Sequence, residues 1–366
     1  MNEYLFTQES KFQDFSRGVL QKLSVNLHLL VKFTQMSKQE TQILKGIAIL
    51  MMVWSHIFNK GDVIELGNLI VVGGKPLVVW LVGACNPVSM FVALGGYGLY
   101  FTYRKGNDRH HYSRILKLYV HYWIILLMFV PVACYFNGSD RYIGAYTEIL
   151  ANITGYNCTW NYECWFLLPY SLLSLAYPIV FKVMNRYHPI IVLLVTFVLT
   201  FAMMCIIHFK VLDEVPWLSL PAVIIEFLFC FTSGALACKY NVVSQSKKWI
   251  VSKVGGNIQG ILLSSMLFLV IMRCLIPHAS WGNLYALIIM LIIIIMKRSA
   301  LLDKGLIYLG NHSMNVWMIH TWFCTYIFHT LTWDLHFPLL IYIAVFTASL
   351  AVSYIVDAIS KGIFHR

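Results

Sequence analysis

The sequence predicts an all-α, polytopic integral membrane protein: a helical bundle of about ten transmembrane helices with both termini in the cytoplasm. Three observations predict this fold. Of the 366 residues, 59% are hydrophobic and only 12% are charged, which is too little polar surface for an ordinary soluble domain. Apolar segments of about 20 residues, enough to cross a hydrocarbon core as a helix, recur along the chain. Lys and Arg residues gather in alternate loops.

The chain divides into three parts. Residues 1–40 are predicted to form a cytoplasmic N-terminal segment, residues 41–358 the membrane domain and residues 359–366 a cytoplasmic tail. The first part carries apolar residues at helical spacing among basic ones, a pattern typical of an amphipathic helix on an anionic membrane surface. A disordered basic tail explains the same composition equally well. The segment lacks the compact apolar core and cleavage site of a signal peptide.

Ten apolar segments are predicted to cross the bilayer as helices, because barrel strands would alternate apolar and polar residues in short runs. The predicted spans are residues 41–58, 84–103, 115–136, 163–183, 189–209, 219–238, 257–276, 281–296, 306–328 and 336–358. With both termini in the cytoplasm, 20 of the 27 Lys and Arg residues lie on the cytoplasmic side and four lie outside. This asymmetry predicts the orientation.

The longest predicted outer loop covers residues 137–162 and is polar and aromatic. It contains three Asn-X-Ser/Thr sequons, at Asn137, Asn152 and Asn157, which do not establish glycosylation on their own. Aromatic residues at the outer level either stack on sugar rings or form an interfacial belt. They are Trp160, Tyr162, Trp165, Trp317, Trp322 and Trp333.

The net charge of +11 does not indicate a nucleic-acid partner, because no basic run is interleaved with aromatic residues on a polar domain. The lipid bilayer is the predicted partner instead. Nine cysteines show neither a CxxC pair nor Cys/His zinc spacing, so no metal is expected and apolar filling of helices is favoured. Cys158 and Cys164 share the outer loop, where an oxidising compartment would allow them to pair.

Ionisable residues inside membrane helices are costly and mark candidate functional positions. On the first predicted span, Lys45 and His56 are eleven residues apart. Eleven steps of about 100° return to nearly the same helix face, about 16 Å further along. One face therefore carries a cation near the cytoplasm and an imidazole near the outside. A lone histidine near a helix end is more often an ordinary interfacial residue, so this spacing alone does not identify a site.

Five motifs together resemble the acyltransferase-3 family of integral membrane O-acyltransferases, the type that modifies bacterial surface polysaccharides. The first is a basic residue eleven positions before a histidine. The others are Phe91-Val-Ala-Leu-Gly-Gly-Tyr97, Tyr112-Ser-Arg114-Ile-Leu-Lys117-Leu-Tyr, Trp160-Asn-Tyr-Glu163-Cys-Trp165-Phe-Leu and Leu309-Gly310-Asn-His-Ser313-Met-Asn-Val-Trp317-Met-Ile-His320. The chain departs from the family pattern at Lys45, Gly95 and His121, where Arg, Ser and Pro are usual.

The resemblance implies catalysis by His56, Glu163 and His320, which the predicted topology brings to one outer level. His56 is expected to act as general base on a sugar hydroxyl, oriented by Glu163, or to accept the acyl group itself. The sequence leaves both routes open.

The resemblance also implies a cytoplasmic donor, acetyl-coenzyme A or another acyl-coenzyme A, and a glycan acceptor outside the inner (plasma) membrane. Lys45, Arg114 and Lys117 are the predicted donor-binding residues, since Arg114 and Lys117 are three residues apart on a helix and could face one anion. The other predicted contributors in the loop are Arg104, Lys105, Arg109, His110 and His111. A loop that fixes topology needs positive charge anyway.

A transporter or flippase for a secreted or lipid-linked glycan is the alternative function. It would need a continuous polar path, to which Glu226, Arg273 and Asp357 could contribute. A purely structural membrane anchor would not require matched ionisable groups on several helices.

Overall fold

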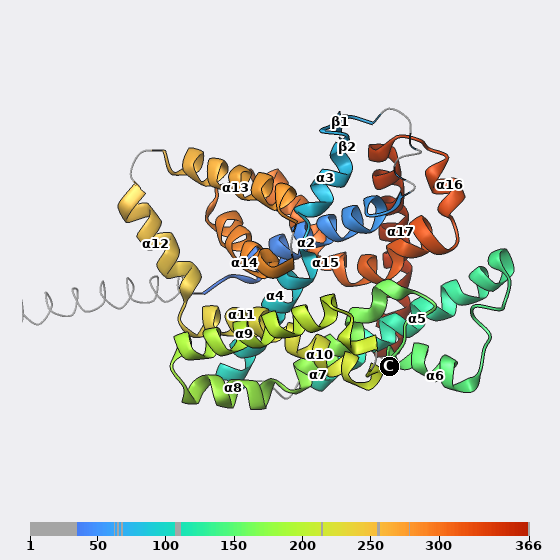
Figure 1. Ribbon diagram of the computed structural model, residues 1–366, viewed down its shortest axis with the longest axis horizontal. Coiled ribbons are helices and arrows are strands. Elements are labelled where there is room, and N and C mark those ends of the chain that lie inside the picture. Colours follow the sequence, from blue (N-terminus) through green and yellow to red (C-terminus); the bar gives the residue numbers. More distant parts are fainter. Residues whose placement is uncertain are drawn as a thin grey trace, which may run out of the picture.

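The computed structural model describes residues 35–61, 63, 66, 69–106, 111–213, 215–254, 257–277 and 279–364, so most of the predicted N-terminal segment lies outside them. The described chain is built of helices, with one two-stranded antiparallel hairpin, β1 (Val71–Val72) and β2 (Lys75–Pro76) (Figure 1). The all-α prediction is therefore confirmed.

The helices of the first half are α2 (Lys38–Phe58), α3 (Leu77–Gly83), α4 (Pro87–Arg104), α5 (His111–Asn137), α6 (Tyr146–Thr154), η2 (Tyr162–Phe166), α7 (Leu167–Leu175), α8 (Tyr177–Arg186) and α9 (Pro189–His208). The second half contains η3 (Val211–Asp213), η4 (Pro216–Leu218), α10 (Ser219–Glu226), α11 (Leu228–Lys239), α12 (Val242–Val254), α13 (Ile258–Leu275), α14 (Ala279–Ile295), α15 (Ala300–Thr321), η5 (Trp322–Tyr326), α16 (His329–Trp333) and α17 (Pro338–Phe364).

Among the described residues, seven helical segments are long and apolar enough to cross a membrane. The segment from η2 to α8 is an eighth candidate, bent by 54° after Leu175. The two other predicted spans correspond to α14, whose apolar part Trp281–Ile295 is short, and to α15, which carries several polar residues. A polytopic membrane protein is thus confirmed, whereas the number ten and the orientation remain predictions.

Helix α2, which carries Lys45 and His56, begins at a capping box. The Ser37 hydroxyl accepts a hydrogen bond from the Glu40 amide at 3.1 Å, and the Glu40 carboxylate accepts one from the Ser37 amide at 2.7 Å. Reciprocal bonds of this kind satisfy amides that a helix start leaves without partners. The cap explains why the helix begins at Lys38, three residues before the predicted span.

Glycine allows two pairs of helices to approach at backbone distance. A Cβ added to Gly46 of α2 would clash with the carbonyl of Leu306 on α15, and one on Gly310 would clash with the carbonyl of Gln42. The same reciprocal arrangement joins α4 to α11, through Gly96 and Gly234. Small residues at such crossings permit dense packing where no hydrophobic force drives helices together. The contacts place α15 directly against α2, with α17 and α5 on its other sides.

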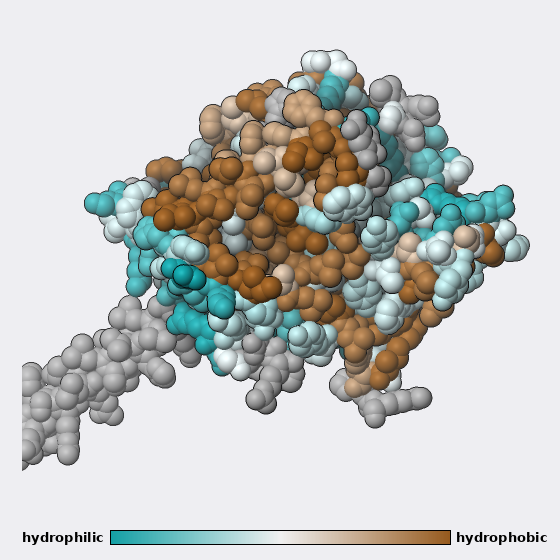
Figure 2. Space-filling model, turned by 60° about the horizontal axis from the view of Figure 1, so that its bottom comes forward, coloured by the Kyte–Doolittle hydropathy of each residue, from teal (hydrophilic) through white to brown (hydrophobic). Residues whose placement is uncertain are grey.

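The outer surface of the bundle fits a bilayer. Figure 2 shows hydrophobic side chains across the middle of one face and hydrophilic ones gathered toward its two margins. Large apolar residues of α9 and α13, such as Leu194 and Phe268, are more than half exposed. Lipid is the solvent in which such a surface is stable.

Candidate active site

Two histidines that are 264 residues apart in sequence form the centre of the site. Nδ1 of His56, in the last turn of α2, lies 2.7 Å from Nε2 of His320, near the end of α15. The planes of the two rings are nearly parallel, with an interplanar angle of 6°. His320 is fully buried, whereas His56 is half-buried. The structure therefore brings together two of the three predicted catalytic residues.

The hydrogen bonds assign the tautomer of each ring. Nδ1 of His320 lies 3.0 Å from the carbonyl of Val316, which can only accept, so this nitrogen carries a hydrogen. When both rings are neutral, Nε2 of His320 must accept, and Nδ1 of His56 must donate. Nε2 of His56 then keeps its lone pair. That atom is the one available to take a proton or to attack a carbonyl.

Glu163 lies at the same end of the bundle but is hydrogen-bonded elsewhere. Its carboxylate accepts a hydrogen bond from the Tyr326 hydroxyl at 2.7 Å, and its backbone carbonyl accepts one from Trp317 Nε1 at 3.0 Å. No hydrogen bond joins this carboxylate to either imidazole in the described chain. His320, rather than Glu163, is thus the residue that contacts and orients His56.

The loop before η2 is fixed around His320. Asn161 Nδ2 donates to the carbonyl of Met318 at 3.1 Å, and the Thr321 hydroxyl donates to Asn161 Oδ1 at 3.0 Å. Asn161 is buried, so both bonds are shielded from solvent. It therefore ties the predicted outer loop to residues on both sides of His320, Met318 and Thr321.

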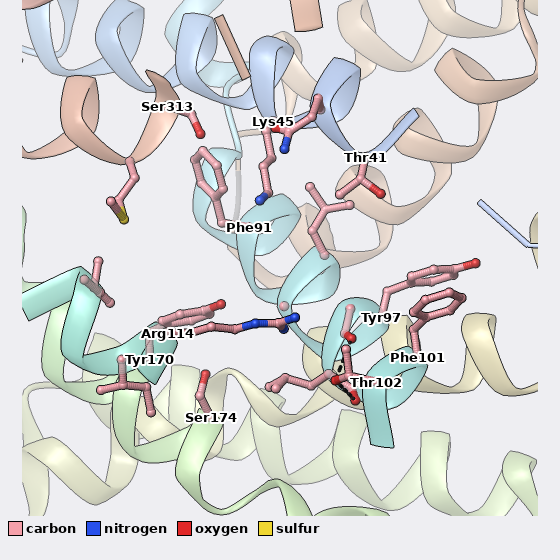
Figure 3. A pocket seen from close by; sticks show the side chains of 18 of the residues that line it. Thr41, Lys45, Phe91, Tyr97, Phe101, Thr102, Arg114, Tyr170, Ser174 and Ser313 are labelled. Atoms are coloured by element: carbon pink, nitrogen blue, oxygen red, sulfur yellow. Dashed lines mark hydrogen bonds between the residues drawn. The ribbon is translucent and has the colours of Figure 1, made fainter. Parts of the chain in front are cut away.

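A cavity of about 640 Å³ opens at the other end of α2. Lys45 from α2 and Arg114 from α5 both project into it (Figure 3). Lys38 also lines the cavity, and no acidic side chain does so among the described residues. Much of the remaining wall is apolar or aromatic, including Phe91 and Trp317. A positively charged pocket with apolar walls suits an anionic ligand that carries an apolar arm.

Lys117 does not line this cavity. The residues of α5 that do so are His111, Arg114, Ile115 and Leu118, a stripe at helical spacing, and Lys117 lies beside that stripe as an exposed side chain. The expectation that it shares one anion with Arg114 therefore has no support from the cavity geometry. Arg109 and His110 lie outside the described residues.

Comparison with known families decides the identity of the fold. The family model described as an acyltransferase domain, that of acyltransferase-3, matches residues 40–358. The chain belongs to the acyltransferase-3 family. Neither the curated proteins nor the solved structures gave a match. The protein is accordingly a membrane acyltransferase.

At one position where this acyltransferase departs from the family pattern, a neighbouring side chain fills the space. A Cβ on Gly95, where Ser is usual, would lie 2.9 Å from the Tyr170 ring and 3.0 Å from its hydroxyl. The space that a side chain at position 95 would need is therefore occupied by Tyr170, which also lines the cavity. The sequence shows that position 95 lacks a side chain, but it does not show that the Tyr170 ring fills the space.

The third departure, His121, belongs to a separate buried cluster of the acyltransferase. Its Nδ1 donates to Asn315 Oδ1 at 2.7 Å, and Asn315 Nδ2 donates to Asp357 Oδ1 at 2.9 Å. These bonds join α5, α15 and α17. In the described chain, no hydrogen bond or ion pair connects Asp357 to Glu226 or Arg273. The three residues proposed for a transport path are therefore not directly linked.

The outer aromatic residues divide into two groups. Trp160, Trp317, Trp322 and Trp333 are at most 9% exposed, so they belong to the protein core and offer no open face to a sugar. Tyr162 and Trp165 are exposed, so each could either stack on a sugar ring or belong to an interfacial belt.

Two of the sequon asparagines are also engaged by the fold. Asn152 is buried and holds the Trp160 amide and the Thr159 hydroxyl, and Asn137 donates to the Tyr326 carbonyl. Asn157 is exposed.

Several residues near the site were not singled out from the sequence. Lys60 and Tyr326 lie outside the five motifs, and Asn161 lies inside the fourth. All three make contacts with segments more than 150 residues away, and no spacing rule reveals such contacts. Lys38 could have been predicted, because it lies seven residues before Lys45 and therefore near the same helix face.

Proposed function

We propose that this acyltransferase transfers an acyl group, acetyl by expectation, from cytoplasmic acyl-coenzyme A to a hydroxyl of a cell-surface glycan outside the inner (plasma) membrane. The observation that carries the proposal is the arrangement along α2. A cationic cavity surrounds Lys45 at one end, and the paired imidazoles of His56 and His320 lie about 16 Å away at the other. Donor and acceptor can then approach from opposite sides of the membrane.

In this proposal, Lys45 and Arg114 hold the phosphates of the donor, with Lys38 at the same cavity. Cations bind phosphate oxygens through charge-assisted hydrogen bonds, and Arg does so in a forked geometry. The apolar walls accommodate the pantetheine arm, whose thioester extends toward Trp317 and the histidine pair. Lys117 adds positive charge outside the cavity wall.

The chemistry assigned to the histidine pair is proton transfer or acyl transfer at Nε2 of His56. As general base, this atom takes the proton of the sugar hydroxyl while the oxygen attacks the thioester carbon. As nucleophile, it accepts the acyl group first and passes it to the sugar. In both routes, the hydrogen bond from His56 Nδ1 to His320 strengthens as positive charge develops on His56.

The test uses the purified protein in lipid nanodiscs with acetyl-labelled coenzyme A and surface glycan from the same cells. We expect label in the glycan, and mass analysis should find the ester. His56→Ala should bind acetyl-coenzyme A normally but transfer about 10² to 10⁴ times more slowly. Lys45→Ala should mainly weaken donor binding. Lys247→Ala is the control, because Lys247 pairs with Glu40 at 3.2 Å and does not line the cavity.

Two results would contradict the proposal. Transfer by His56→Ala at the parental rate would remove the histidine from the mechanism. Glycan that crosses the membrane but stays chemically unchanged would favour the transporter alternative.

A further inference from the structure

Lys60 is a half-buried cation at the histidine end of the bundle that none of the five motifs contains. It lies two residues after the end of α2 and four residues after His56. Its ammonium donates to the Thr325 hydroxyl at 2.6 Å and to the Cys324 carbonyl at 3.3 Å. The ammonium is therefore held in place.

The two residues that hold Lys60 belong to η5, a π-helical turn that begins two residues after His320. Single π-helical turns often occur at functional sites, because they redirect backbone groups that an α-helix would use internally. Here the turn directs the Cys324 carbonyl and the Thr325 hydroxyl toward Lys60. One helix end thus fixes both the ring that orients His56 and the cation beside it.

The contacts place this ammonium near the histidine pair. His56 contacts His320, and Lys60 is bonded to Cys324 and Thr325, which follow His320 by four and five residues. Two of its three N–H donors are used by η5 in the described chain, which leaves one for a ligand. Among the described residues, no carboxylate lies within ion-pair distance of it.

Acyl transfer from a thioester develops negative charge on the carbonyl oxygen, which a fixed donor or cation stabilises. Attack by the sugar hydroxyl, or by Nε2 of His56, forms a bond to the carbonyl carbon and moves the carbonyl electron pair onto its oxygen. In the direct route, His56 takes the hydroxyl proton during attack, collapse breaks the carbon–sulfur bond, and the leaving thiolate takes that proton from His56. In the nucleophilic route, collapse breaks the carbon–sulfur bond and leaves an acyl-imidazolium on His56 and a thiolate; the sugar hydroxyl then attacks the acyl carbon, the carbon–nitrogen bond breaks, and the hydroxyl proton goes to the thiolate. In each route the negative charge of the tetrahedral intermediate lies on the former thioester carbonyl oxygen. Donors fixed at such an oxygen are among the largest contributors to enzymatic acyl transfer.

We propose that Lys60 stabilises the tetrahedral oxyanion formed beside His56, with Thr325 fixing its ammonium. This inference rests on the proposed function, since it assigns a role within that reaction. The competing explanation is that Lys60 only caps the carbonyl of Cys324 and stabilises η5. The two explanations differ in what they predict for turnover, donor affinity and stability.

The experiment compares Lys60→Gln, Lys60→Arg and Thr325→Val with the parent in nanodiscs, using acetyl-coenzyme A and the purified glycan. Lys75→Gln is the matched control, a half-buried cation at the same end that lies 4.9 Å from the centre of the Trp80 ring. We expect Lys60→Gln to lower kcat by roughly 10²- to 10³-fold, with unchanged acetyl-coenzyme A binding and thermal stability. Lys60→Arg should recover most of kcat. Thr325→Val should lower kcat about tenfold, because the Lys60 ammonium keeps its charge but loses the hydroxyl that fixes its position.

A double variant completes the test. Because Lys60 acts on an intermediate formed at His56, Lys60→Gln should add little to the defect of His56→Ala. The inference is overturned if Lys60→Gln keeps kcat within twofold of the parent, or if it lowers stability and activity together and Arg rescues neither. If the parent and Lys75→Gln transfer no acyl group at all, it is the proposed function that fails.

Discussion

His56 is chemically distinct from an interfacial histidine because of the ring beside it. Since His320 Nδ1 is bound to Val316, its other nitrogen is an acceptor, and this fixes the hydrogen of His56 on Nδ1. The nitrogen assigned the chemistry in the proposed function, Nε2, is therefore defined before any substrate arrives. A free imidazole would divide its population between two tautomers, only one of which presents a lone pair at Nε2.

The roles of the two histidines can be separated by substitution. His320→Ala removes the acceptor that fixes His56 but keeps the reactive ring, so we expect a smaller loss of kcat than for His56→Ala, whose loss should be about 10²- to 10⁴-fold. The double variant should be no slower than His56→Ala alone, because the two rings act as one unit. Single-turnover transfer by the three variants measures this. A double variant much slower than either single one would mean that His320 acts independently of His56.

The sequence predicted the residues of the site better than their contacts. The sequence motifs and topology pointed to Lys45, His56, Glu163 and His320, which lie on α2, α15 and the neighbouring η2. The hydrogen bond between Tyr326 and Glu163 was not expected, because it depends on where η5 turns the chain. The sequence grouped Lys117 with Arg114: three residues apart, the two side chains differ in direction by about 60° around α5, and only Arg114 faces the cavity.

At the scale of elements, α15 combines polar chemistry with burial. Its polar residues point to different neighbours: His320 to α2, Asn315 to α5 and α17, and Ser313 to the cavity. The half of α15 that carries these residues is largely buried, because a helix with polar residues on several faces is costly to expose to lipid. The same polar residues explain why α15 lies directly against α2 and fails a simple test of hydropathy.

The glycines of α2 and α15 are expected to determine how closely the site's two helices approach. In Gly310→Ala, the new methyl group meets the Gln42 carbonyl, which cannot move without shifting α2. Overpacking of this kind costs roughly 1–3 kcal/mol, and we expect a lower unfolding temperature and slower transfer. Gly305→Ala is the control on the same helix, because a Cβ there meets nothing within 4 Å. Equal thermal stability of the two variants would show that the crossing tolerates separation.

Helix positions were predictable because lipid imposes a length and an apolar composition on every exposed span. The breaks inside the predicted spans were less visible. The segment after residue 163 bends by 54° between α7 and α8, and Pro178 at the start of α8 removes a backbone donor there. The apolar pattern continues through such breaks, since both halves still face an apolar environment.

At the scale of the whole molecule, the reciprocal glycine contacts and the distant histidine pair require α2 and α15 to run in the same direction. The predicted first and ninth spans have this relation. The cavity therefore begins at the Lys38–Lys45 end of this parallel helix pair and extends to Trp317, which is bonded to Glu163 and lies three residues before His320. In the proposed function, the donor's phosphates and the acyl transfer are at different depths.

The absolute orientation follows from charge and can be tested directly. Because 20 of the 27 Lys and Arg residues fall on one side in the predicted topology, we expect that side to remain in the cytoplasm. A cysteine at Asp140, in the outer loop, should react with an impermeant maleimide in intact cells. One at Lys105, after α4, should react only after permeabilisation, and a reporter at either terminus should be cytoplasmic. The parent, with its nine native cysteines, gives the background. Labelling of Lys105→Cys but not Asp140→Cys in intact cells would invert the topology, and would place the cationic cavity on the side from which acyl-coenzyme A cannot reach it.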